Sequence, residues 1–224
     1  MSKRLLFAAL VVGAVSGPAS AAIYLADFST ASPLVGGAVQ GDGSVWGVQS
    51  LSTGTPATSW SASVGSFDYV KHGNSGYQCA GGSGGCIELG GSTGHGGSLA
   101  TPPSTVQFTL NLAAGSYSVS FDWSRQLNNS GFQFQIGNAT PVLFPVLPAT
   151  GVWSSFSQSF SVASAGDVTF SFLTGNLSGN VGSLIDNVSV VPEPASWAML
   201  LAGGLTVGLV ARRRRGRGAA AIGA

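Results

Sequence analysis

The chain has 224 residues, of which 44% are hydrophobic and only 8% are charged, and 34 of them are glycine. Its formal net charge of +1 is unevenly distributed, because Lys71 and Arg125 are the only basic residues between positions 22 and 191, where seven acidic residues lie. This segment therefore carries a net charge of −5, which excludes the basic surface that a nucleic-acid-binding protein needs.

The N-terminus has the three parts of a secretory signal peptide. Lys3 and Arg4 give a positive start, residues 5–15 form a run of apolar and small residues, and Ala19-Ser20-Ala21 fits the small-x-small pattern of a cleavage site. The alternatives are a buried helix or an uncleaved anchor, but the apolar run is short for a membrane span. We therefore expect residues 1–21 to be removed as a signal peptide, with the cut at or one residue beyond Ala21.

Residues 22–191 are long enough for one extracellular domain with a hydrophobic core. In their C-terminal half, hydrophobic and polar residues alternate with a period of two, which is typical of antiparallel strands with one solvated face. Six such runs follow one another between Gly, Asn and Pro turns, so we expect an all-β fold, an antiparallel and jelly-roll-like β-sandwich. The six runs are residues 106–112, 117–123, 132–136, 156–162, 168–172 and 184–190.

The half that precedes residue 101 is less regular. Residues 23–28, 44–51 and 67–73 are candidate strands, and residues 73–97 are expected to form a long Gly/Ser loop. Long loops on sandwiches often carry function. The sequence leaves open whether this loop is functional or merely flexible.

Cys79 and Cys86 are the only cysteines of the chain, and both fall in this loop. In an oxidising compartment, an even number of cysteines close in sequence predicts a disulfide. The alternative is a metal or redox pair, but the spacing is not C-x-x-C and there is no second pair. We expect a structural disulfide that contributes about 2–3 kcal/mol by closing a short loop.

Residues suited to catalysis are scarce. The only histidines, His72 and His95, lie in Gly-rich segments, and the sequence has no G-x-S-x-G motif of the kind that presents a nucleophilic serine. A glycosidase needs two facing carboxylates, and nothing in the spacing of Glu88 and Asp68 favours that role. We therefore expect no catalytic residue and a protein that is not an enzyme. The alternative is a secreted, glycosidase-like hydrolase whose active site the sequence does not reveal.

Sequence motifs for metal binding are missing too. Asp27 lies near the first expected strand and Asp186 near the last, and these strands often pair in sandwiches. Together with Asn187, the two carboxylates would then offer oxygen ligands to Ca²⁺. The alternative is that Asp186 and Asn187 bond backbone amides in a turn. No other cofactor is expected.

Sugar binding needs aromatic faces beside amide and carboxylate groups. Trp46, Trp60 and Tyr77 lie in irregular segments and are the candidate ligand contacts, although core packing explains their presence equally well. Trp123 lies on the apolar face of its expected strand, and we assign it to the core.

The C-terminus again has three parts, which are Pro192-Glu193-Pro194, an uncharged apolar stretch at residues 195–211, and the arginines Arg212, Arg213, Arg214 and Arg215. As a helix the apolar stretch would be about 25 Å long, at the short end of a transmembrane span. The arginines would stay in the cytoplasm and stop transfer, which agrees with an exported body. We expect one transmembrane helix over residues 195–211 and a short tail over residues 218–224.

The pattern of residues 192–217 resembles the PEP-CTERM sorting signal of Gram-negative bacteria. The resemblance implies that an exosortase, an integral-membrane cysteine transpeptidase, recognises this tail and removes it near Pro192-Glu193-Pro194. Residues 216–224 depart from the pattern, because such tails usually end sooner after the arginines.

Residues 113–190 also resemble a known class of domain, through the runs AAGSYSVSFDWS and GSLIDNVSV. They are similar to secreted β-sandwich domains that precede such tails, which in turn resemble carbohydrate-binding modules. We therefore expect an exported, non-catalytic envelope or extracellular-matrix protein in contact with exopolysaccharide. The resemblance implies that it is first anchored in the membrane and then reaches the cell surface or the medium. A purely structural surface protein is the further alternative.

Overall fold

The computed structural model describes residues 23–32, 34–74, 77–91, 104–125, 131–145, 149–174 and 182–193. All of them belong to one compact unit, Ala21–Glu193. The expected signal peptide and the expected membrane helix at 195–211 lie outside these residues. Within them, no helix is long and apolar enough to cross a membrane.

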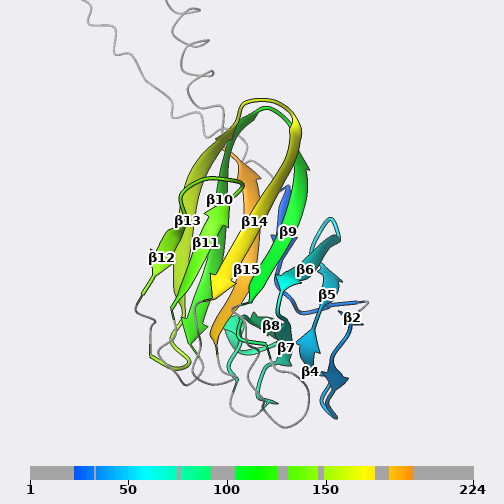
Figure 1. Cartoon of the computed structure of the whole chain (residues 1–224). Coiled ribbons are helices and arrows are strands. Elements are labelled where there is room, and N and C mark those ends of the chain that lie inside the picture. Colours follow the sequence, from blue (N-terminus) through cyan, green and yellow to red (C-terminus); the bar gives the residue numbers. More distant parts are fainter. Residues whose placement is uncertain are drawn as a thin grey trace, which may run out of the picture. The chain divides into compact units, whose positions relative to one another are not determined.

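The described residues form two antiparallel sheets (Figure 1). In the first sheet β15 is central, because it pairs with β10 along one side and with both β8 and β1 along the other. The strand order is β13 (Ser154–Val162), β10 (Gly115–Arg125), β15 (Ser183–Pro192), β8 (Gly85–Glu88), β7 (Phe67–Lys71), β4 (Val45–Val48) and β3 (Ala38–Val39), with β1 (Tyr24–Ala26) on β15.

The second sheet contains the remaining strands. Its order is β12 (Val142–Phe144), β11 (Phe132–Ile136), β14 (Gly166–Thr174), β9 (Thr105–Leu112), β6 (Thr58–Val64), β5 (Ser50–Thr53) and β2 (Leu34–Val35). The chain crosses from one sheet to the other between β9 and β10 and again between β13 and β14, in the arches at the top of Figure 1. The jelly-roll topology stays a prediction.

The period-two alternation explains why these strands form. In β9, for example, every second residue from Val106 to Leu112 is buried while Thr109 and Asn111 are exposed, as expected for a sheet with one solvated face. All six runs predicted from the alternation lie within strands, so the prediction of an antiparallel all-β fold is confirmed. The matching strands are β9, β10, β11, β13, β14 and β15.

Aromatic rings from the two sheets meet in the core. Phe121 of β10 lies 5.0 Å from Phe134 and 5.1 Å from Phe172, both of the facing sheet, measured between ring centroids. Trp60 stacks on Phe108 at 4.4 Å and has none of its surface exposed. Such rings bury large apolar areas in specific geometries, which holds the two sheets face to face. Trp123 packs at the margin of this core, as predicted.

The expected loop at residues 73–97 proves to be partly structured. It contains a short 3₁₀ turn, Ala80–Gly82, and the strand β8, whose four residues GCIE are all buried. Sequence patterning missed β8 because it is buried on both faces and therefore shows no alternation. Residues 92–97 of the expected loop lie outside the described residues.

Candidate functional site

The Pro192-Glu193-Pro194 segment begins inside the sandwich. Pro192 is the last residue of β15 and lies opposite Tyr117 of β10. The backbone N–H of Glu193 then donates a hydrogen bond of 2.9 Å to the carbonyl oxygen of Ser116. Pro194 and Arg212–Arg215 lie outside the described residues. The segment is therefore joined to the sheet without a linker.

Proline is tolerated here because no ladder partner in the described part of the chain faces the position of its missing N–H. The bond from Glu193 to Ser116 makes those two residues a hydrogen-bonded pair, so Pro192 and Tyr117 form the adjacent pair, which exchanges no hydrogen bonds. On the other side of β15, the pairing with β1 ends at Val190. Position 192 thus behaves as an edge position, where proline is allowed.

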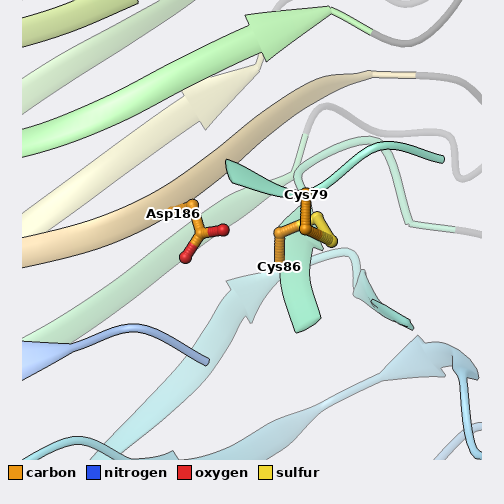
Figure 2. A group of neighbouring side chains, drawn as sticks. All are labelled: Cys79, Cys86 and Asp186. Carbon is orange, nitrogen blue, oxygen red and sulfur yellow. A yellow bond between two sulfur atoms is a disulfide. The ribbon is translucent and has the colours of Figure 1, made fainter. Parts of the chain in front are cut away.

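The predicted disulfide between Cys79 and Cys86 is present, with a distance of 5.5 Å between the two Cα atoms. It closes the turn that precedes β8 and lies in a small second cluster with Val70, Tyr77 and Leu184. Figure 2 shows that Asp186 lies beside this disulfide. Because both sulfurs are committed to the bond, the three residues do not form a metal site.

Asp186 holds this turn against β15. One carboxylate oxygen accepts the N–H of Ala80 at 3.0 Å and the other accepts the N–H of Asn187 at 2.8 Å. Burial raises the pKa of Asp186 to about 7, with these two hydrogen bonds opposing the shift and the charges of Asp122 and Asp27 adding to it. This arrangement matches the alternative in which Asp186 bonds backbone amides.

The proposed calcium ligands lie in different environments. Asp186 is 2% exposed, whereas Asp27 is exposed and accepts hydrogen bonds from the N–H and hydroxyl of Ser29. The two are close enough for the charge of Asp27 to act on Asp186. Binding of Ca²⁺ by Asp27 and Asp186 stays a prediction.

A pair of buried carboxyl groups lies under Tyr77. Asp68 and Glu88 are opposite each other on β7 and β8 and are 1% and 0% exposed. Glu88 Oε1 accepts the N–H groups of Gly90 and Gly182, and Oε2 has no hydrogen-bond partner among the described residues. Burial raises the pKa of Glu88 well above 4.5, and the charge of Asp68 raises it further. A fully buried Glu88 offers no surface to a substrate.

An open depression of about 910 Å³ lies beside this region. It holds the ammonium group of Lys71 and the imidazole ring of His72, together with amide, hydroxyl and carboxyl groups. Four glycines also leave backbone groups accessible in its wall. The lining consists of Gln40, Gly41, Asp42, Lys71, His72, Gly73, Asn74, Gly82, Ser83 and Gly84.

Lys71 is only loosely held in this depression. Its ammonium group lies 5.1 Å from the centre of the Tyr69 ring and 3.4 Å from the carbonyl oxygen of Ser29. Its own backbone N–H donates to the hydroxyl of Ser44, which in turn donates to Asp42. The strand and the turn thus fix the backbone of Lys71, while its charge faces an open surface.

The three predicted aromatic contacts differ in exposure. Trp60 lies in the core, where its indole N–H donates to the hydroxyl of Tyr24 at 2.6 Å, and this corrects its assignment as a ligand contact. Tyr77 is 6% exposed. Trp46 is half-buried and lies 5.8 Å from the Tyr77 ring, so it alone keeps a substantial exposed face.

Sequence reasoning missed the depression and the carboxyl pair. Both depend on turns at residues 40–44 and 72–84 that bring distant segments together, as in the hydrogen bond from the N–H of His72 to the carbonyl of Gly84. The one usable signal was that Lys71 is one of only two Lys or Arg residues between positions 22 and 191 and is directly followed by His72.

The buried carboxyl pair generates a prediction about pH. Since the pKa of Glu88 is higher in the folded chain than its ordinary 4.5, its contribution to stability is full below pH 4.5 and is lost as pH rises towards the folded pKa. Glu88→Gln keeps the acceptor for both glycine amides and cannot ionise. We expect the free energy of unfolding of Glu88→Gln, measured by urea denaturation, to rise relative to that of the wild type between pH 5 and pH 8. Parallel pH profiles for the two proteins would contradict this.

Comparison with known structures finds carbohydrate-binding domains at low similarity. The CBM22-1 xylan-binding domain of Paenibacillus barcinonensis Xyn10C is 13% identical, with a TM-score of 0.43 over 78% of this chain and 97% of that domain. TmCBM61, solved with β-1,4-galactotriose, is 15% identical, with a TM-score of 0.40 over 60% of this chain and 87% of that one. A module of Cellvibrio mixtus lichenase 5A, solved with cellotriose, is 13% identical, with a TM-score of 0.36 over 78% of this chain and 100% of that one.

At these TM-scores, the ligands of the three domains do not indicate a ligand for this chain. None of the curated protein sequences matches it. The C-terminus, however, gives a specific result. Residues 190–215 match the family model of the PEP-CTERM protein-sorting motif. The chain therefore carries a PEP-CTERM sorting motif that starts at the end of its last β-strand.

Proposed function

We propose that this chain is an exported envelope or extracellular-matrix protein. In this proposal an exosortase-type enzyme processes it at Pro192-Glu193-Pro194, and its β-sandwich then contacts polysaccharide without catalysis. The observation that carries the proposal is the sorting motif at residues 190–215, directly continuous with β15. The signal-peptide pattern at residues 1–21 supports the same route from the other end of the chain.

The burial of the carboxyl pair supports a non-catalytic role. Two carboxylates that act on a glycosidic bond must both reach the substrate, whereas Glu88 is fully buried and Asp68 bonds the N–H of Gly47 at 2.6 Å. The pair instead ties β7 to β4 through Gly47, and β8 to the backbone of Gly90 and Gly182. Hydrolysis of a polysaccharide by the wild type, lost in Glu88→Gln, would favour the hydrolase alternative.

The depression supports a polysaccharide ligand. Sugar-binding sites combine convergent polar groups with an accessible concave surface, and this one offers Lys71, His72, Asn74 and Gln40. Because Lys71 brings one of the body's two Lys or Arg side chains to this depression, the saccharide best suited to it carries carboxylate groups.

Processing is tested by the intact mass of the full-length protein expressed with and without an exosortase. With the enzyme, we expect a species that lacks residues 1–21 and everything beyond the Pro192-Glu193-Pro194 segment. Without it, we expect a membrane-bound species that retains Arg212–Arg215. If the arginines are retained in both strains, the tail is only an anchor and the sorting proposal fails.

Polysaccharide binding is tested by Lys71→Gln, with Arg125→Gln as the matched control, since both variants remove one positive charge from the body. We expect Lys71→Gln to weaken binding to a soluble polyuronate by about tenfold or more, the worth of a charge-assisted hydrogen bond. Arg125→Gln should leave binding unchanged. Affinity electrophoresis measures both, with an uncharged β-glucan for comparison. Equal retardation of all three proteins would argue against this depression, and no binding by any of them would favour a purely structural protein.

A further inference from the structure

The beginning of the sorting motif is part of the folded sheet, and this affects how a processing enzyme can reach it. We propose that the sorting enzyme acts on a locally frayed form of the sandwich, in which residues 191–193 have separated from β10 while Val190 remains paired. The proposal rests on the proposed processing at Pro192-Glu193-Pro194. It adds that the fold of the sandwich sets the rate of that processing.

In the folded chain, the backbone of the motif is already engaged. Val191 is paired with Ser118 and the N–H of Glu193 is bonded to Ser116, with Pro192 between them opposite Tyr117. Enzymes and receptors that take an extended peptide do so through its main-chain hydrogen bonds. A main-chain group cannot serve β10 and an enzyme cleft at the same time, so the segment must leave the sheet before it is bound.

Burial indicates how far the opening extends. Val190 is fully buried, is paired with Tyr24 of β1, and accepts the N–H of Ile23 at 2.8 Å through its carbonyl. Beyond it, Val191 and Pro192 are only half-buried and Glu193 is exposed. Among the described residues, 191–193 thus pair only with β10, whereas Val190 pairs with both β10 and β1.

The opening is therefore local. Strand ends with few buried contacts open at a small fraction of the free energy of global unfolding, and each hydrogen bond lost contributes only about 1 kcal/mol. The pairing with β1 stops the opening before it reaches the core residues Val188 and Ile185. A folded sandwich remains a substrate in this scheme, but only during the fraction of time in which its last three residues are unpaired.

Two variants of the full-length chain change this pairing in opposite directions. Inserting Gly-Ser-Gly-Ser between Val190 and Val191 leaves the motif intact and moves it out of the sheet. The double variant Ser118→Cys/Val191→Cys joins two cross-strand partners, whose spacing in an antiparallel ladder suits a disulfide. The matched controls are the same insertion after Gly137, where a side chain would meet nothing within 4 Å, and Ser120→Cys/Ser157→Cys, which joins β10 to β13 instead.

The measurement is a pulse-chase of tail removal in cells that contain the exosortase. We expect the insertion before Val191 to speed processing by about 5- to 30-fold, the factor that one or two kcal/mol represents. The Ser118–Val191 crosslink should slow processing until a mild reductant is added. Both controls should be processed like the wild type.

Each outcome has a distinct meaning. If the insertion and the crosslink variants are processed at the wild-type rate, the motif is used as folded and the fraying proposal is overturned while the proposed function stands. If only the insertion speeds processing, distance from the sandwich and not pairing controls access, and the proposal also fails. If none of the chains, including the wild type, loses its tail, the proposed function itself is wrong.

Discussion

The pairing of β15 with β10 is the interaction on which the rest of the structure depends. It extends from the pair of Ser183 with Arg125 to the pair of Pro192 with Tyr117. Along its other side, β15 receives β8 at its start and β1 at its end. One strand thus joins the N-terminal strand, the disulfide region and the sorting motif in a single sheet. Its inward residues Ile185, Val188 and Val190 are fully buried, so this sheet is also fixed to the core.

A bulge in this pairing builds the polar region of the sheet. The register shifts between Ser120 and Asp122, and Asn187 adopts a φ of 50° there, a left-handed conformation that asparagine tolerates better than most residues. The bulge allows the Asn187 side chain to donate to Asp122 at 2.8 Å, while Asp186 bonds the turn that contains the disulfide. A structural irregularity of one residue therefore couples β10 to the turn before β8.

Sequence reasoning succeeded for some strands of the sandwich and failed for others. Alternation identified β9, β11 and β14 because each has one wet face, and local spacing was enough to pair Cys79 with Cys86. It missed β8, which is buried on both sides, and it missed β6, where Trp60 and Ala62 alternate with serines and pack in the core.

The candidate site was beyond sequence reasoning for a related reason. Asp68 and Glu88 are twenty positions apart and become neighbours only through the pairing of β7 with β8. Lys71 and Asp42 line one depression because two turns meet there. By contrast, the sorting motif was readable because its three parts are contiguous. What the sequence did not reveal is that the first of these parts is also the end of a strand.

The central claim, that the motif begins inside the folded sheet, is tested most directly by amide hydrogen exchange on the full-length chain. The N–H of Leu89, bonded to Ser183 at the opposite end of β15, serves as the internal reference. We predict strong protection of Leu89 and weaker but measurable protection of Glu193, about tenfold or more over an unstructured peptide, since strand ends open more readily than buried ladder positions. Exchange of the Glu193 N–H at the unstructured rate, with Leu89 still protected, would show that the motif lies outside the sheet and would contradict the account.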